Sequence, residues 1–339
     1  MKKSLLFLAS AALVLASCNN DVKLDENTAP AGSNAQKEIA LSAFTTPIKH
    51  VKSNAPVDGT TFTPTTMKVA AYDVTNNREF FGATTFTKDA TTWKGSKYWP
   101  LSAAYINFLA YSELEASSDP TLTWGATATT ATWALVMSDN KSEQKDLMYA
   151  IGNGAVTQSD NALSFPTNVP MTFEHAQAWI SFYADAYDAT SGGKVTLQSI
   201  TLNGAKYNGT YTLTFTNYND DEDQAVAGAW SALGSTADVA VPNWTPAAIA
   251  YDESGNGVEV GKGLMIVPDD NAETADFTSF TIAYTLDSKN YTYTYTPASR
   301  NVDQKKHYIY NIVFHLHEIE ILPDVTDWAD QTPVNVPVF

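Results

Sequence analysis

From residue 39 onward, short runs of alternating apolar and polar residues are separated by clusters of Gly, Asn, Asp, Ser and Pro. Such alternation places successive side chains on opposite faces of a strand, and the clusters between the runs are typical of turns. No segment predicts a long helix, and no helix–strand alternation indicates βαβ units. We expect strands at Ile39–Phe44, Met67–Val74, Phe80–Thr87, Tyr105–Tyr111, Thr132–Met137, Leu147–Ile151, Met171–Ala184, Val195–Leu202, Tyr211–Thr216, Gly263–Val267, Phe277–Leu286, Tyr291–Thr296 and Tyr308–Ile321.

The clearest hairpin lies between Phe280 and Thr296. Its polar connection, residues 287–290, is followed by alternating tyrosines that share one face of the returning strand: Tyr291, Tyr293 and Tyr295.

The pattern predicts an all-β chain of two tandem β-sandwich domains, residues 38–165 and 166–339. We place the boundary near residues 159–167, because Gly152-Asn153-Gly154 precedes this stretch and Phe165-Pro166 and Val169-Pro170 lie in or beside it.

The first residues have the pattern of a bacterial lipoprotein signal peptide. Lys2 and Lys3 precede an apolar run, residues 5–15, which leads into Leu15-Ala16-Ser17-Cys18, a lipobox. We expect cleavage between Ser17 and Cys18, so that residues 1–17 are removed and the Cys18 thiol carries the lipid. The alternative is a plain secretory signal with an incidental cysteine.

Residues 18–37 are polar and lack periodicity, so they predict a flexible tether. No other apolar run approaches the ~18 residues that a membrane span requires. Because Cys18 is the only cysteine, an internal disulfide is excluded. We therefore expect a lipid anchor at the outer membrane or cell surface of a diderm bacterium.

Composition narrows the function further. The net charge of −17 leaves no surplus of Lys and Arg to replace counterions on a phosphate backbone, so nucleic acid is excluded as a partner. Docking onto anionic lipid by charge is disfavoured for the same reason. The abundance of Thr and aromatic residues is typical of strands.

Candidate chemistry is sparse. His315 and His317 share a strand face, but no third zinc ligand accompanies them, and the face continues into Ile319 and Ile321. Two acidic stretches invite a calcium interpretation but lack the Gly and Glu of an EF-hand loop, and solvated loops are the simpler explanation: Asn217-x-Asn219-x-Asp221-x-Asp223 and Asp269-x-Asn271-x-Glu273. No catalytic motif is present. We expect no enzyme activity, no cofactor and no metal.

Several segments in order resemble the fimbrillin-like family, the type V pilins and related surface lipoproteins of Bacteroidales. After the lipobox these segments are Trp93–Pro100, Tyr105–Tyr111, Asp146–Ala150, Met171–Ala178, Lys306–Ile312, Ile319–Ile321 and Val325–Trp328. The resemblance covers nearly the whole chain. The aromatic residues of these segments are expected to pack in the core or at its rim, and His175 is expected to be a hydrogen-bonded structural residue.

The resemblance implies transthyretin-like, Greek-key sandwiches and a structural or adhesive subunit of a fimbrium. In polymerising members a protease removes the tether with the first strand, and an extended strand of another subunit fills the emptied groove. The corresponding first strand here has Ile39, Leu41 and Ala43 on one face. The candidate donor strand, residues 332–339, has another alternating set: Val334, Val336 and Val338. The alternative for that segment is an ordinary edge strand, where Pro337 is tolerated.

This sequence departs from the family pattern at the site of proteolytic processing. Cleavage in this family follows an arginine, yet the arginines here are Arg78 and Arg300, and Arg78 lies too late to release only the first strand. Either Lys49 or Lys52 is used, or the chain is not processed and does not form a stalk.

The resemblance implies other pilin subunits, outer-membrane lipid through Cys18, and a host or bacterial surface ligand as partners. The alternative function is that of a non-polymerising surface lipoprotein. It would bind glycans through exposed tryptophans, for which the candidates are Trp124, Trp133, Trp230 and Trp244.

Overall fold

The computed structural model describes residues 37–45, 65–112, 121–126, 130–137, 141–142, 144–159, 162–216, 225–255, 257–269, 274–315 and 319–327. Every regular element in these ranges is a β-strand, which confirms the all-β prediction. Within the same ranges there is no helix with the length and apolarity needed to cross a membrane.

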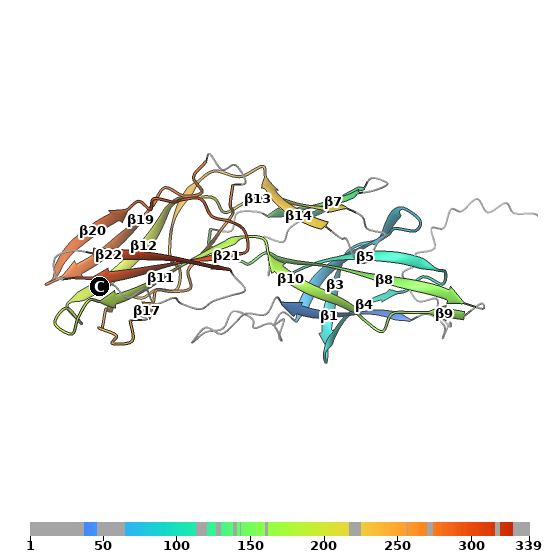
Figure 1. The fold of residues 1–339 in the computed structure, drawn as a ribbon, viewed down its shortest axis with the longest axis horizontal. Helices are drawn as coiled ribbons and strands as arrows, with labels where there is room; N and C mark the ends of the chain where they lie inside the picture. Colours follow the sequence, from blue (N-terminus) through green and yellow to red (C-terminus); the bar gives the residue numbers. More distant parts are fainter. Residues whose placement is uncertain are drawn as a thin grey trace, which may run out of the picture.

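The strands form an elongated molecule with two lobes, placed end to end (Figure 1). The first lobe is one eight-stranded sheet in the order β10-β1-β4-β3-β2-β5-β8-β9. Its strands are β1 (Glu38–Thr45), β2 (Thr66–Asp73), β3 (Arg78–Asp89), β4 (Thr92–Tyr98), β5 (Ala104–Ser112), β8 (Met148–Ser159), β9 (Ala162–Ser164) and β10 (Val169–His175).

This sheet closes on itself, because β10 pairs with β8 as well as with β1. The two layers expected of a sandwich are therefore continuous with each other here. The enclosed core is rich in aromatic residues, and Trp99 meets Phe108 edge-on at 5.6 Å between ring centroids.

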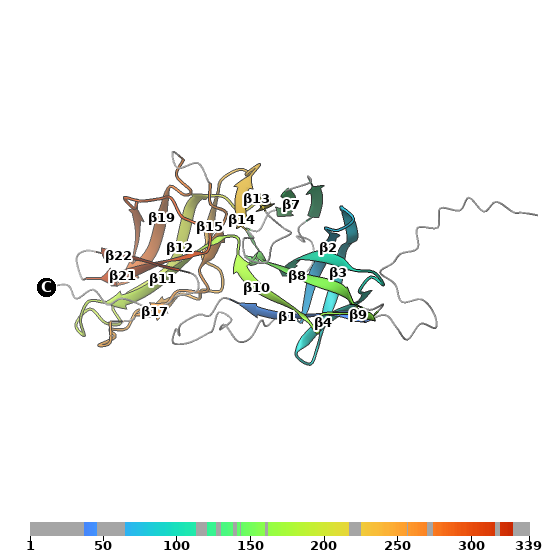
Figure 2. The same cartoon turned by 45° about the vertical axis from the view of Figure 1, so that its right-hand side comes forward.

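The second lobe is two five-stranded sheets that face each other (Figure 2). One has the order β17-β11-β21-β22 with β18 beside β11, and the other has the order β15-β12-β19-β20 with β16 beside β12. Phe182 and Phe280 join the two layers, with ring centroids 5.2 Å apart. The bounds are β11 (Ala178–Ala186), β12 (Val195–Ala205), β15 (Ala237–Ala240), β16 (Ala247–Ala248), β17 (Val258–Glu259), β18 (Leu264–Ile266), β19 (Ser279–Leu286), β20 (Lys289–Tyr295), β21 (Lys306–Phe314) and β22 (Ile319–Asp327).

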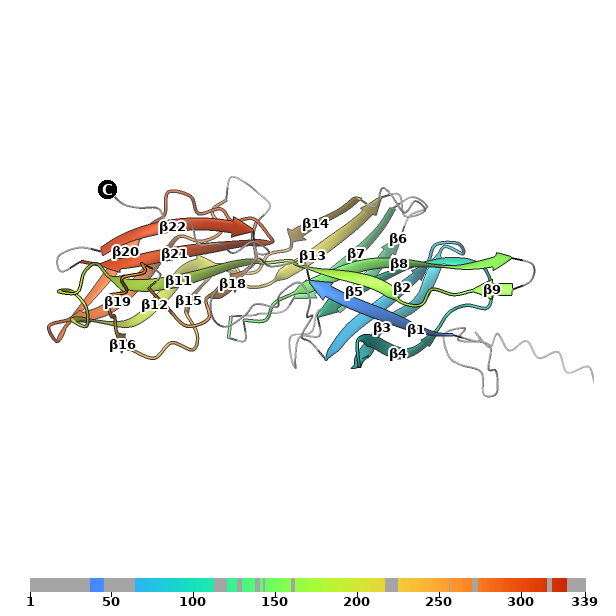
Figure 3. The same cartoon turned by 60° about the horizontal axis from the view of Figure 1, so that its bottom comes forward.

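A four-stranded sheet, the junction sheet, lies where the lobes meet (Figure 3). Its order is β14-β13-β7-β6, and its strands are β6 (Thr121–Ala126), β7 (Thr130–Met137), β13 (Gly209–Thr216) and β14 (Ala225–Ser231). Strands from opposite sides of the expected boundary pair within it, since β7 lies beside β13 along its whole length. The junction sheet helps to enclose a third core, to which both lobes contribute.

The expected boundary at residues 165 and 166 also divides the first sheet. Strand β10 lies beyond it, yet Val169, Met171 and Phe173 are fully buried in the core of the first lobe. The glycines that suggested a break, Gly152 and Gly154, lie inside β8. A Cβ on Gly154 would approach Trp99 to 2.5 Å, so this glycine is needed for close packing.

Two predicted strands are each two strands. The predicted strand 171–184 is interrupted by a bend at Ala176 and Gln177, and the predicted strand 308–321 divides into β21 and β22. The predicted tyrosine hairpin is confirmed, although its turn is shorter than expected. Asp287 and Ser288 alone connect β19 to β20, and both have positive φ.

Candidate functional site: the β1 groove

The β1 groove is the space between β10 and β4 that β1 occupies in the closed sheet. Leu41 to Thr45 pair in parallel with β10, while Glu38, Ala40 and Leu41 pair in antiparallel fashion with β4. Leu41 is therefore opposite both Val169 and Trp93. Without β1, the facing edges of β10 and β4 would lose this partner.

The apolar face of β1 points into the core, as the alternation predicted. Ile39 and Leu41 are fully buried, and Ala43 is 7% exposed. Burial of an Ile or Leu side chain stabilises a fold by about 1.5–3 kcal/mol.

Two side-chain hydrogen bonds are described for β1. Asn168 Nδ2 donates to Ser42 Oγ at 3.1 Å, and the main-chain N–H of Ser96 donates to Glu38 Oε1 at 3.2 Å. Both bonds are exposed to solvent. The strand is held mainly by main-chain ladders and apolar side chains, which other extended segments of similar alternation can supply.

Beyond the groove, β10 leads into a connection that is fully buried and firmly bonded. Ala176 and Gln177 have no exposed surface. The Ala176 carbonyl accepts from Trp230 Nε1 at 2.6 Å, and Gln177 Oε1 accepts from the Leu147 N–H at 2.9 Å. The Gln177 carbonyl accepts from the Lys305 N–H at 3.0 Å. The passage from the first lobe to the second is therefore held by buried hydrogen bonds.

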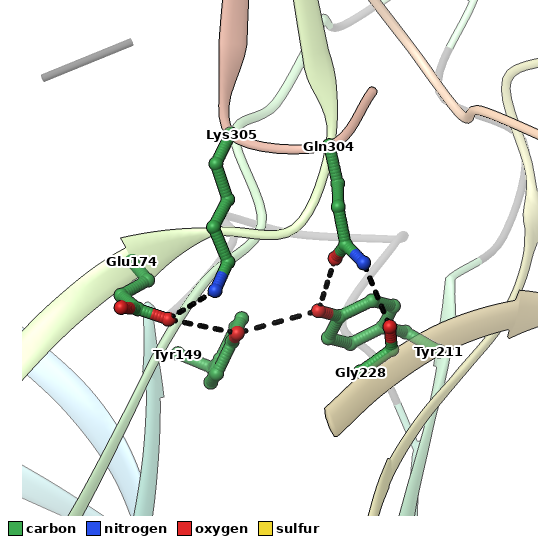
Figure 4. A network of polar contacts seen from close by, with 6 residues as sticks. All are labelled: Tyr149, Glu174, Tyr211, Gly228, Gln304 and Lys305. Atoms are coloured by element: carbon green, nitrogen blue, oxygen red, sulfur yellow. Dashed lines mark hydrogen bonds and ion pairs between the residues drawn. The ribbon is translucent and has the colours of Figure 1, made fainter. Parts of the chain in front are cut away.

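A polar network beside this connection joins β8 and β10 to the second lobe (Figure 4). Tyr149 donates to Glu174 Oε2 at 3.0 Å, and Lys305 Nζ lies 2.5 Å from the same oxygen. Burial raises the pKa of Tyr149 well above its ordinary value, so the phenol keeps its proton.

The network continues into the junction sheet. Tyr211, on β13, donates to Gln304 Oε1 at 2.5 Å, and Gln304 Nε2 donates to the Gly228 carbonyl at 2.7 Å (Figure 4). The hydroxyl oxygens of Tyr211 and Tyr149 are 3.3 Å apart. The network therefore links β10 to β8 and to residues 304–305, and Gln304 extends it to β13 and β14.

Comparison with known proteins identifies the fold. A family model described as fimbrillin-like matches residues 34–328. The chain belongs to the fimbrillin-like family. No curated protein matches it.

Solved structures are similar at low sequence identity. A candidate cell adhesion protein of Bacteroides ovatus ATCC 8483 is 12% identical, with 87% of this chain and 98% of that chain covered and a TM-score of 0.50. A fimbrial protein of Bacteroides vulgatus ATCC 8482 is 15% identical, with coverages of 77% and 92% and a TM-score of 0.47. The tip fimbrial protein Mfa3 of Porphyromonas gingivalis is 10% identical, with coverages of 86% and 100% and a TM-score of 0.40. The Bacteroides ovatus structure supports the fold assignment.

Several predicted site residues lie outside the described ranges. These are Ser17 and Cys18, Lys49 and Lys52, and the donor set Val334, Val336 and Val338. Both acidic stretches also fall largely outside, and of the second only Asp269 is described, 2.7 Å from Lys206 Nζ.

The histidines that the structure describes have structural surroundings. His315 stacks on Tyr187 at 4.1 Å and lies 3.5 Å from Glu320 Oε2, while His317 is outside the described ranges. His175 Nδ1 lies 2.8 Å from Asp146 Oδ2. Among the described residues no group of three acidic, His or Cys side chains could hold a metal.

Two of the four tryptophans proposed for glycan stacking have described side chains. Trp230 is 4% exposed and bonded to Ala176, so its face cannot meet a sugar. Trp244 is half-buried against the second-lobe core and donates to the Leu197 carbonyl at 3.3 Å. The remaining pair, Trp124 and Trp133, lies on β6 and β7, but their side chains are outside the described part.

The polar network is not predicted by the sequence. Glu174, Gln304 and Lys305 are residue types typical of a surface, and they join one network because the turn before β21 lies beside β10 and the junction sheet. The sequence identifies Trp230 as an aromatic residue but does not predict its hydrogen bond to the Ala176 carbonyl.

Proposed function

We propose that this chain is a surface fimbrial subunit that assembles by strand exchange at the β1 groove. In this account β1 leaves the closed sheet, and the C-terminal segment of another copy, residues 332–339, takes its place. The observation that carries the proposal is the way β1 is held, by main-chain pairing on both edges and by Ile39, Leu41 and Ala43. Repetition of this contact would give an open filament.

The proposed donor has the alternation that the groove requires. Val334, Val336 and Val338 repeat every second residue, as the three buried residues of β1 do. Valine is close in size to Ile39 and Leu41 but larger than Ala43, so the third position would be the tightest.

The precursor would be anchored through lipid on Cys18, after cleavage between Ser17 and Cys18. Processing after Lys49 or Lys52 would then remove the tether together with β1. The supporting observation is that β1 ends at Thr45, just before both lysines. In this account the subunit is at the outer membrane first and in the fimbrium afterwards. No enzymatic role is proposed.

Intact mass and N-terminal sequencing of protein sheared from cells test this proposal. We expect a mature N-terminus at His50 or at Ser53, loss of the tether together with β1, and SDS-resistant oligomers that are weakened by deletion of residues 332–339. A surface form that retains lipid on Cys18 and stays monomeric would contradict it.

A lysine variant pair makes the test specific. The double change Lys49→Ala and Lys52→Ala should block processing and polymer formation. Lys37→Ala is the matched control, because Lys37 precedes β1 and cleavage there cannot release the strand. If the double variant is processed normally, neither Lys49 nor Lys52 is the cleavage site.

A further inference from the structure

Strand β20 is the outermost strand of its sheet and lies at the end of the second lobe, beyond β19 (Figure 1). It pairs with β19 along its whole length without a register shift, and no other described strand pairs with it. Residues 289–294 are all exposed, including Tyr291 at 42% and Tyr293 at 37%. The free edge therefore offers main-chain donors and acceptors to another strand.

Other edges of the second lobe are protected. Strand β22 carries Pro323, β17 has two residues, and β15 has four residues and an irregular register. Proline, short length and irregularity each hinder pairing with a further strand. Strand β20 has seven residues, no proline, and a single charge at its first position, Lys289.

The turn before β20 determines which main-chain groups face outward. Because Asp287 and Ser288 form a two-residue turn, the closing pair of Leu286 and Lys289 exchanges hydrogen bonds, and every second residue after Lys289 does likewise with β19. The N–H and C=O groups of the alternate residues therefore point away from β19: Asn290, Thr292 and Thr294.

We propose that β20 pairs in antiparallel orientation with β20 of a second copy, about a twofold axis at Thr292. In this register Thr292 faces its own counterpart, and Asn290 faces Thr294 of the second copy. All three outward-facing residues then lie in hydrogen-bonded pairs. A twofold contact of this kind is closed, so it joins two copies laterally.

The side chains suit a second copy of the same strand. Tyr291 faces Tyr293 of the second copy in the closer, non-hydrogen-bonded pairs, and aromatic pairs across strands are stabilising. The chain has a net charge of −17, yet β20 contains no acidic residue. Two copies can therefore meet here without acidic side chains of β20 facing each other. The pairing does not depend on exchange of β1.

Cysteine substitution tests the register in the chain from Asn19 onward, which lacks Cys18 but retains every described residue. Residues facing each other in a hydrogen-bonded pair have Cα atoms about 5.5 Å apart, within the range for a disulfide. Thr292→Cys should give a disulfide-linked dimer under mild oxidation. Thr294→Cys alone should give no disulfide-linked dimer. Asn290→Cys combined with Thr294→Cys in one chain should give one. Thr281→Cys, on the interior strand β19, is the matched control.

Sedimentation velocity over a concentration series tests the association itself. We expect a weak monomer–dimer equilibrium that Thr292→Pro shifts to monomer, since proline removes an outward N–H without removing a bond to β19. A chain that stays monomeric at all concentrations, or a dimer that Thr292→Pro does not change, would overturn the proposal. Oligomers that grow beyond dimers through β20 would also contradict a closed contact.

Discussion

Glu174 and Lys305 connect the two lobes, with Glu174 Oε2 lying 2.5 Å from Lys305 Nζ. Glu174 follows Phe173, which is buried in the first-lobe core, on the strand that pairs with β1. The wall of the β1 groove is thereby bonded to the turn that precedes β21. This ion pair does not involve β1, so it remains when β1 leaves the sheet.

Leu41→Ala should destabilise the first lobe strongly. Leu41 is fully buried and pairs with strands on both sides, and truncation of a buried Leu costs about 2–5 kcal/mol. Ser42→Ala is the neighbouring control and should cost about 1 kcal/mol or less, because its bond to Asn168 is exposed. Urea unfolding measures both, and equal losses would contradict the burial assigned to β1.

Trp230→Phe should weaken the junction. The change removes the donor to the buried Ala176 carbonyl, and an unsatisfied buried acceptor costs about 1–3 kcal/mol. Trp244→Phe is the matched control, with a longer bond of 3.3 Å and a half-buried ring. Its expected loss in the free energy of unfolding is smaller. A Trp230 variant as stable as the parent would show that this bond does not hold the connection.

Gly228→Ala should disrupt the polar network. A Cβ at this position would overlap the hydroxyl of Tyr211, which must then leave Gln304. We expect a loss of about 1–3 kcal/mol. Gly192→Ala is the control, since its Cβ would meet nothing closer than 3.3 Å. If both variants unfold at the same urea concentration, the network contributes little to stability.

The stability of the protein should fall with acid in a way that depends on His307. Burial lowers the pKa of His307 to about 3, and its ring stacks on Trp179 at 3.9 Å with Nε2 2.6 Å from Ser181 Oγ. In the unfolded chain this histidine takes up a proton near its ordinary pKa of 6.5, whereas in the folded protein it stays neutral. The unfolded state therefore binds more protons between about pH 6.5 and pH 3, and the free energy of unfolding falls as the pH is lowered through this window.

The size of the effect is about 1.4 kcal/mol per pH unit below pH 6.5. His307→Gln should reduce the slope between about pH 6.5 and pH 5, whatever it does to the stability at about pH 8. Urea unfolding of both proteins at several pH values measures the slope. Parallel pH profiles would mean that the pKa of His307 is the same in the folded and unfolded protein.

Periodicity predicted much of the fold. The alternation of Ile39, Leu41 and Ala43 correctly gave the buried face of β1, and the tyrosines of β20 correctly gave a hairpin. These predictions succeed because a period of two reports directly which side chains face a core.

Long-range pairing could not be read in the same way. Nothing local in β7 indicates that it pairs with β13 rather than with its own lobe, and nothing in β10 indicates that it closes the first sheet. Gly152 and Gly154 predicted a break because glycine is typical of turns, yet here it admits Met171 and Trp99 against β8. The polar network depends on the long-range pairing of these strands, so the sequence did not predict it either.

Exchange of β1 for the C-terminal segment is tested most directly with a subunit from which β1 has been removed. A chain that ends at Gln331 cannot donate to other copies; a specific protease site inserted in it between Lys52 and Ser53 would allow cleavage, and gel filtration in mild denaturant would separate the strand. Fluorescence anisotropy then follows binding of a labelled peptide of residues 328–339. The account predicts binding to the cleaved subunit, competition by a peptide of residues 37–45, and no binding to the uncleaved protein or by a scrambled peptide. A cleaved subunit that binds peptide 37–45 again but not peptide 328–339 would contradict it.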